Sequence, residues 1–177
     1  MMTTARIPPM EVAELDDDAR ALVGSVDTSG VEGGGVLRTL VRHRELFRQF
    51  VPYASLLLHG NIDPRVRELI ALRIADRCDS QYEWAKHQAL AIAAGLTDDD
   101  FEAIRTSGYS HWTGEMEAVV RAVDELHDNA TVTDETWELL SAHYDQQDLI
   151  EVVFLVGHLH LVAYLLNAFR VQIEDPS

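Results

Sequence analysis

Glu68, Ser80, Glu83 and His87 are the residues whose types and spacing best suit proton transfer. They lie in the stretch ELIALRIADRCDSQYEWAKH, which runs from residue 68 to residue 87. Glu83 and His87 are four residues apart, so a helix would place both side chains on one face. A carboxylate can hold an imidazole in one tautomer, and a second carboxylate from a neighbouring helix would complete an acid–base set. The pattern therefore indicates proton-transfer chemistry.

Each of these residues also has a purely structural interpretation. Ser80 and Glu83 fit the S-x-x-E capping box, in which each side chain accepts a backbone N–H bond of the first turn. Such a cap stabilises a helix by about 1 kcal/mol and needs no catalytic role. His87 would then be an ordinary helix histidine, and Glu68 would pair with a neighbouring arginine at the surface. Both interpretations remain open at the level of sequence.

Metal binding is a weaker alternative for the same residues. Glu83, His87 and Glu68 have acceptable ligand chemistry for Zn, Mn or Fe. However, the sequence contains no HExxH motif and no paired ExxH motifs of the diiron type. We therefore expect no metal and no other cofactor at this site.

Four further residues are candidates for the wall of a pocket: Tyr82, Cys78, His158 and His160. The two histidines are two positions apart, so on a helix they diverge by about 200°. We expect one of them to face the core and the other to face away from it. Cys78, the only cysteine, excludes an internal disulfide and is interpreted as a small buried filler, with a one-cysteine peroxidase as the minority alternative.

The elements that must position these residues are all helical. Asp63 and Pro64 are typical of a helix start, and that helix should run to Arg77. No segment shows strand alternation bounded by turn signals. We expect an all-α fold of about seven or eight helices. The predicted ranges are 11–23, 36–50 with a restart at Pro52, 63–77, 80–94, a short helix from 97, 115–127, 133–143 and 147–171.

Domain organisation follows from the same pattern. Residues 1–35 should form an N-terminal arm, a helix and a glycine-rich connector, and residues 36–177 a helical domain, so the chain is a single domain overall. The net charge of −16 disfavours nucleic acid and anionic membranes as partners. No apolar signal segment is present at the start, and the single cysteine fits a cytoplasmic location. Polar residues interrupt the apolar segment 152–169, so we expect a buried helix there.

The same stretch resembles the carboxymuconolactone decarboxylase and AhpD-type alkylhydroperoxidase superfamily. Redox members carry a Glu, a Cys-x-x-Cys pair, and a His four residues after the second Cys. The Glu corresponds to Glu68 and the His to His87, while Ser80 and Glu83 occupy the cysteine positions. The segments RVRELIALRIADRC and YEWAKHQALAIAAGLTDDD resemble the branch that lacks the redox pair. The last helix resembles the segment that covers the family's site, which implies that one of His158 and His160 lines the pocket.

The resemblance implies the compact multi-helix AhpD-like fold and a homo-oligomer, a trimer or a hexamer. It implies a small-molecule enzyme that decarboxylates or isomerises a lactone or related carboxylate without thiol redox chemistry. His87 would be the acid/base, Glu83 its orienter, Glu68 a second proton carrier, and Ser80 a donor to a substrate carboxylate. The alternatives are alkylhydroperoxidase or peroxiredoxin-like activity, which ordinarily needs two thiols, and a non-catalytic binding protein on the same fold.

Overall fold

The computed structural model describes residues 4–26, 34–106 and 108–173, and these ranges contain nine α-helices, one short 3-10 helix and no strand. The all-α prediction is confirmed, with slightly more helices than expected. In chain order they are η1 (Val12–Glu14), α1 (Asp17–Gly24), α2 (Gly34–Leu40), α3 (Arg44–Leu58), α4 (Pro64–Arg77), α5 (Gln81–Ala93), α6 (Asp98–Ile104), α7 (Glu115–Asn129), α8 (Asp134–Ser141) and α9 (Gln146–Phe169).

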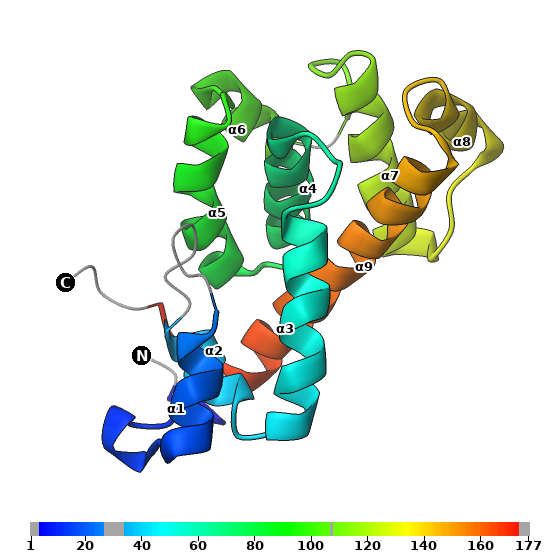
Figure 1. Ribbon diagram of the computed structural model, residues 1–177. Helices are drawn as coiled ribbons and strands as arrows, with labels where there is room; N and C mark the ends of the chain where they lie inside the picture. The colour runs from blue at the N-terminus through cyan, green and yellow to red at the C-terminus, as the bar shows by residue number, and fades with distance from the viewer. Residues whose placement is uncertain (1–3, 27–33, 107, 174–177) are drawn as a thin grey trace.

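Helix α4 is the centre of the molecule. It begins as predicted, with the Asp63 carboxylate accepting the Arg65 N–H and proline at the first helical position. It contacts α5, α6, α7 and α9. Figure 1 shows α5 and α6 on one side of α4 and α7 and α8 on the other, with α9 running obliquely past them behind α3. The fully buried side chains of α4 include Leu69, Ile70, Leu72 and Ile74, so this helix supplies much of the core.

The joint between α4 and α5 brings the candidate residues together. Asp79 adopts a left-handed conformation, with φ of 50°, directly after the end of α4. This conformation reverses the chain within three residues, and Ser80 then precedes the first turn of α5. The two helices consequently lie side by side, and residues on their facing sides can meet.

The break predicted at Pro52 is wrong. Helix α3 continues through Pro52, and the interruption instead lies at residues 41–43, between α2 and α3. The ring of His43 accepts the N–H of Leu46 and begins α3. Proline removes one backbone donor from a helix interior, but packing of α3 against α9 retains the helix there.

The N-terminal region forms a second, smaller apolar cluster made of Leu15, Ala19, Val41 and Phe47. The helix expected at 11–23 is divided into η1 and α1, because the Asp16 carboxylate accepts the Ala19 N–H and starts a new helix. Most of the glycine-rich connector, residues 27–33, lies outside the described residues. The boundary between 1–35 and 36–177 therefore stays a prediction.

Helix α9 is long and apolar enough to cross a membrane by length and composition, but half of its most apolar window is buried inside the protein. It contacts α3, α4, α7 and α8. A helix surrounded in this way is apolar because it is core. The prediction of a buried last helix is thus confirmed, with its ends within two residues of the expected ones.

Candidate active site

Three of the four expected catalytic residues, Glu68, Glu83 and His87, line one cavity of about 460 Å³. Its wall is mostly apolar and comes from α2, α3, α4, α5 and α9. Ser80 is the exception: it is buried but lines a different, smaller hollow beside Trp84 and Arg105. The structure therefore separates Ser80 from the main cavity, and its expected contact with a substrate carboxylate stays a prediction.

His87 and Glu68 form the polar centre of this cavity. The His87 Nδ1 atom lies 2.7 Å from Glu68 Oε2, and both side chains are buried. A carboxylate can only accept a hydrogen bond, so in this contact the imidazole is the donor: Nδ1 carries the hydrogen and Nε2 is left with a lone pair. An imidazole held in this way by a carboxylate is ready to accept a proton.

The partner of His87 is not the one expected from spacing. Glu83 and His87 lie on one helix, and side chains on one helix all lean toward its N-terminus, so they run alongside each other. Glu68 approaches from the facing helix, α4, and reaches the ring edge directly. The predicted roles are thereby exchanged: Glu68 orients the imidazole, and Glu83 is the separate carboxyl group.

Glu83 is a buried carboxyl group with unusual surroundings. Its side chain is only 3% exposed, and among the described residues neither oxygen has a hydrogen-bond partner of normal geometry. Burial raises the pKa of Glu83 to about 8, while the nearby Ser80 hydroxyl acts weakly in the opposite direction. Glu83 therefore holds its proton at neutral pH and is a potential proton donor.

The predicted capping box is absent. The Ser80 side chain makes no capping hydrogen bond, although Ser80 does occupy the position before the first turn of α5. Glu83 points into the protein interior instead of folding back onto the Ser80 amide, because α5 packs its first turn against α4. The S-x-x-E motif is compatible with a capping box, but the packing of α5 against α4 buries Glu83 and keeps it from the Ser80 amide.

His158 lines the same cavity, as one of the two histidines of α9 was expected to do. Its ring stands edge-on to Tyr53 and near Phe50, with centroid distances of 5.3 Å and 5.5 Å. Burial, and secondarily the charge of nearby His87, lowers the pKa of His158 to about 4. A neutral His158 therefore faces the cavity at physiological pH. Tyr82 also lines the cavity, as predicted.

Two cationic side chains in the wall were not singled out from the sequence. Arg67 and Lys86 both line the cavity, and Arg67 Nε lies 3.4 Å from Glu68 Oε1. They directly precede Glu68 and His87, but consecutive residues of a helix diverge by about 100°, so the sequence did not place them in the same wall. In a chain of net charge −16 they make this cavity suited to an anionic group.

Cys78 and His160 do not line this cavity, contrary to expectation. They lie instead beside His127, with Cys78 Sγ 4.0 Å from His127 Nδ1. Cys78 is half-buried, and burial, followed by the charge of Glu83, raises the pKa of its thiol to about 11. His127 was missed because no spacing in the sequence connects it with residues 78 and 160.

Residues 44–125, which contain the cavity residues of α3, α4 and α5, match the Carboxymuconolactone decarboxylase family. No functionally curated protein matches the chain.

Solved structures share the fold across nearly the whole chain. An alkylhydroperoxidase AhpD core protein, an uncharacterized peroxidase-related protein from Ralstonia eutropha JMP134, is 19% identical with a TM-score of 0.79, covering 98% of this chain and 94% of its own. An uncharacterized peroxidase-related protein from Silicibacter sp. TM1040 is 14% identical with a TM-score of 0.78, covering 99% and 96%. The debrominase Bmp8, in complex with 2,3,4-tribromopyrrole, is 16% identical with a TM-score of 0.76, covering 99% and 95%.

Proposed function

We propose that this chain, which belongs to the carboxymuconolactone decarboxylase and AhpD-like superfamily, is an acid–base enzyme that decarboxylates or isomerises a small, largely apolar carboxylate such as a lactone acid. The observation that carries the proposal is the 2.7 Å contact between His87 and Glu68 at the wall of an apolar cavity. A buried carboxyl group in the same wall, Glu83, supplies an acid beside this base.

The proposed reaction uses the residues in distinct roles. Arg67 and Lys86 hold the substrate carboxylate or the oxygen on which negative charge develops. In isomerisation, His87 Nε2 removes a proton from carbon, and Glu83 returns one at the other end of the allylic system. In decarboxylation, the bond to the carboxylate carbon breaks, CO₂ leaves with no need for a base, and Glu83 protonates the resulting dienolate. Glu68 is a positioning residue that keeps Nε2 unprotonated.

Peroxide reduction is the second candidate, because relatives in the superfamily are described as peroxidase-related. It would have to use Cys78, since Ser80 and Glu83 replace the two thiols. Cys78 lies outside the cavity, and its raised pKa keeps it as a thiol, the less reactive form. These observations favour the acid–base proposal. A non-catalytic binding role is less well supported, because it predicted no enclosed pocket and a Glu83 engaged only in the cap.

The size of the ligand is supported by a structural neighbour. The debrominase Bmp8 binds 2,3,4-tribromopyrrole, a small halogenated heteroaromatic. A ring of that size fits a cavity of about 460 Å³ with an apolar wall. We extend the proposal to a small unsaturated or aromatic substrate body carrying one acidic group.

Self-association and a cytoplasmic location complete the proposal. Five large apolar residues of α9 are exposed, Ile150, Val153, Phe154, Leu161 and Tyr164, and such a surface is typical of a subunit interface. The single cysteine is consistent with a reducing compartment.

The test is turnover of a panel of carboxylated γ-lactones and β,γ-unsaturated acids in D₂O, followed by NMR for CO₂ loss, double-bond shift and deuterium uptake. We expect Glu83→Gln to lower turnover by at least roughly 100-fold, and His87→Gln to do so for isomerisation. His143→Gln changes an exposed histidine away from the cavity and should leave turnover unchanged. Turnover that survives both cavity variants would overturn the proposal, and cumene hydroperoxide consumption that disappears in Cys78→Ser would support the peroxidase alternative.

A further inference from the structure

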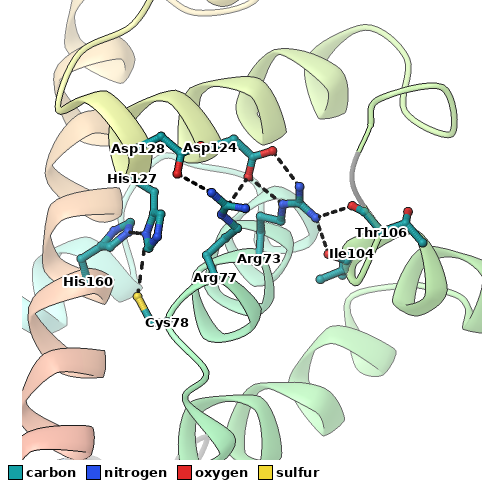
Figure 2. A network of polar contacts seen from close by, with 9 residues as sticks. All are labelled: Arg73, Arg77, Cys78, Ile104, Thr106, Asp124, His127, Asp128 and His160. Carbon is teal, nitrogen blue, oxygen red and sulfur yellow. Dashed lines mark hydrogen bonds and ion pairs between the residues drawn. The ribbon is translucent and has the colours of Figure 1, made fainter.

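Cys78, His127 and His160 form a cluster that the acid–base site does not use. Cys78 ends α4, His127 lies in the last turn of α7, and His160 lies in the middle of α9. Figure 2 shows the three side chains pointing toward one another from these three helices. Their ligand atoms all lie within 4.8 Å of one another. Because residues from three distant parts of the sequence converge here, the cluster is a product of the tertiary fold.

The distances are close to those of a tetrahedral metal site. His127 Nδ1 lies 3.0 Å from His160 Nε2 and 4.0 Å from Cys78 Sγ. Zinc bonds of about 2.3 Å to sulfur and about 2.0 Å to nitrogen place tetrahedral ligand atoms roughly 3.3 to 3.6 Å apart. Cys78 Sγ and His160 Nε2 lie within 4.8 Å of each other. Side-chain shifts of up to about 1 Å would therefore bring all three atoms to bonding distance of one ion.

The tautomer of His160 is already set for metal binding. Its Nδ1 lies 2.9 Å from the carbonyl oxygen of Val156, so Nδ1 carries the hydrogen and donates it to that oxygen. The lone pair of Nε2 consequently faces His127 and Cys78. In histidines that bind a metal, the ring nitrogen that does not contact the ion commonly donates a hydrogen bond of this kind, which orients the ring and increases its basicity.

Hydrogen bonds also anchor the backbone of Cys78, the third proposed ligand. The side-chain amide of Asn167, about two helical turns beyond His160 on α9, donates to the carbonyl of Cys78 at 2.7 Å. The Cys78 N–H donates to the carbonyl of Ile74 within α4. The position of the cysteine relative to α9 is therefore maintained without a metal.

We propose that Cys78, His127 and His160 bind one divalent transition-metal ion of the zinc class, with the fourth position taken by water. One thiolate and two imidazoles are a borderline-soft donor set, which favours Zn²⁺ and its neighbours over Mg²⁺ or Ca²⁺. In the metal-free protein, His127 Nδ1–H donates to His160 Nε2. Binding moves the His127 hydrogen to Nε2 and releases one proton from the Cys78 thiol, so the charges and protons balance.

This site is independent of the proposed acid–base reaction, since neither His127, His160 nor Cys78 lines that cavity. Its immediate effect is structural, because the ion would join α4, α7 and α9. A ligand that binds only the folded state stabilises it according to its affinity. The metal should accordingly raise the thermal midpoint of the wild-type chain.

The experiment is a titration of chelator-treated full-length protein with Co²⁺, followed by displacement with Zn²⁺. We expect one Co²⁺ to bind per chain. The bound ion should give a near-ultraviolet thiolate-to-cobalt charge-transfer band and visible d–d bands with the high intensity of tetrahedral coordination. All of these bands should disappear when Zn²⁺ displaces the cobalt. Cys78→Ser should abolish the charge-transfer band and lower Zn²⁺ affinity by roughly 100-fold or more, and His160→Gln should weaken binding similarly. Circular dichroism of each variant checks that it is folded, and Cys78→Ala provides a second variant should one fail.

Two control variants locate the ion. His143→Gln, an exposed histidine outside the cluster, and His87→Gln, in the acid–base cavity, should both bind Co²⁺ as the wild type does. The proposal is overturned if cobalt binds without a thiolate band, if Cys78→Ser binds Zn²⁺ as tightly as the wild type, or if only His87→Gln removes binding. Saturation reached only at millimolar metal would equally count against it.

Discussion

At the scale of single residues, the site depends on two buried carboxyl groups that differ in their surroundings. Glu68 bonds to the ring of His87, whereas Glu83 has no hydrogen-bond partner of normal geometry among the described residues. Hydrogen bonding favours the charged form, and desolvation without compensation favours the neutral form. The cavity therefore combines an imidazole held by one carboxyl group with a second, neutral carboxyl group, which is the arrangement that the proposed acid–base reaction requires.

The neutral state of Glu83 makes a prediction about stability. Its pKa rises from 4.5 in the unfolded chain to about 8 in the folded protein, so the folded protein binds the extra proton between these values. Stability should fall as pH rises through this window, because the unfolded state releases that proton first. We expect Glu83→Gln to remove this dependence and to exceed the wild type at pH 8 by on the order of 3 kcal/mol.

Urea unfolding at pH 5, 7 and 8 measures this difference. The advantage of Glu83→Gln should shrink toward pH 5, because this pH lies only just above the pKa of Glu83 in the unfolded chain and most of the window up to its folded-state pKa has not been crossed. If the free energy of unfolding changes with pH equally in the wild type and in Glu83→Gln, Glu83 is ionised in the folded state and the prediction is wrong.

The bond between Glu68 and His87 makes a second prediction. Glu68→Gln retains the shape of the side chain but loses the charge that holds hydrogen on Nδ1. Long-range ¹H–¹⁵N NMR should show a predominant Nδ1–H tautomer of His87 in the wild type and a mixture in the variant. Turnover by isomerisation should fall about 10- to 100-fold with little change in KM, because the residue acts through His87. An unchanged tautomer would contradict the positioning role.

At the scale of secondary-structure elements, α4 is joined to α7 by a buried ion pair. Arg73 makes two parallel bonds to Asp124, at 2.8 Å and 2.7 Å, and also donates to the carbonyls of Ile104 and Thr106 (Figure 2). Arg73 and Asp124 are both buried. The side chain of Arg73 thus connects α4, α7 and the C-terminal end of α6. Helix α4 also carries Glu68 and ends at Cys78.

Loss of this connection should be costly. Arg73→Met leaves the buried Asp124 with only its longer contact to Arg77, at 3.8 Å, and we expect a loss of about 3 kcal/mol of unfolding free energy. Arg48→Met is the matched control, because Arg48 pairs with Asp18 at the exposed surface and its loss should cost less than about 1 kcal/mol. Urea unfolding at pH 7 compares the two, and similar small losses would show that the buried pair adds little.

At the scale of the whole molecule, α9 is both a core helix and an exposed one. Its buried side packs against α3, α4, α7 and α8, while Phe154 and Tyr164 are each more than half exposed on the other side. An apolar stripe along a helix of 24 residues is long enough for a second chain to cover. This is the surface through which the proposed homo-oligomer would form.

The oligomer makes the last prediction. Phe154→Glu places a charge in the apolar stripe and should dissociate the assembly into folded monomers, as measured by size-exclusion chromatography with light scattering. Ile92→Glu, a change of an equally exposed apolar residue on α5, should leave the assembly intact. A wild type that is already monomeric at micromolar concentration would refute self-association.

The sequence by itself determined the helical class, most helix positions and the identity of the cavity residues Glu68, Glu83 and His87, because apolar periodicity and caps such as Asp63-Pro64 act locally along the chain. It could not determine which carboxylate meets His87 or whether Glu83 caps α5, since both depend on how α4 packs against α5. It also could not bring Cys78, His127 and His160 together, or place Arg67 and Lys86 in the wall of the cavity. Those contacts join residues distant in the chain, and only the packing of α4, α7 and α9 around one core sets their distances.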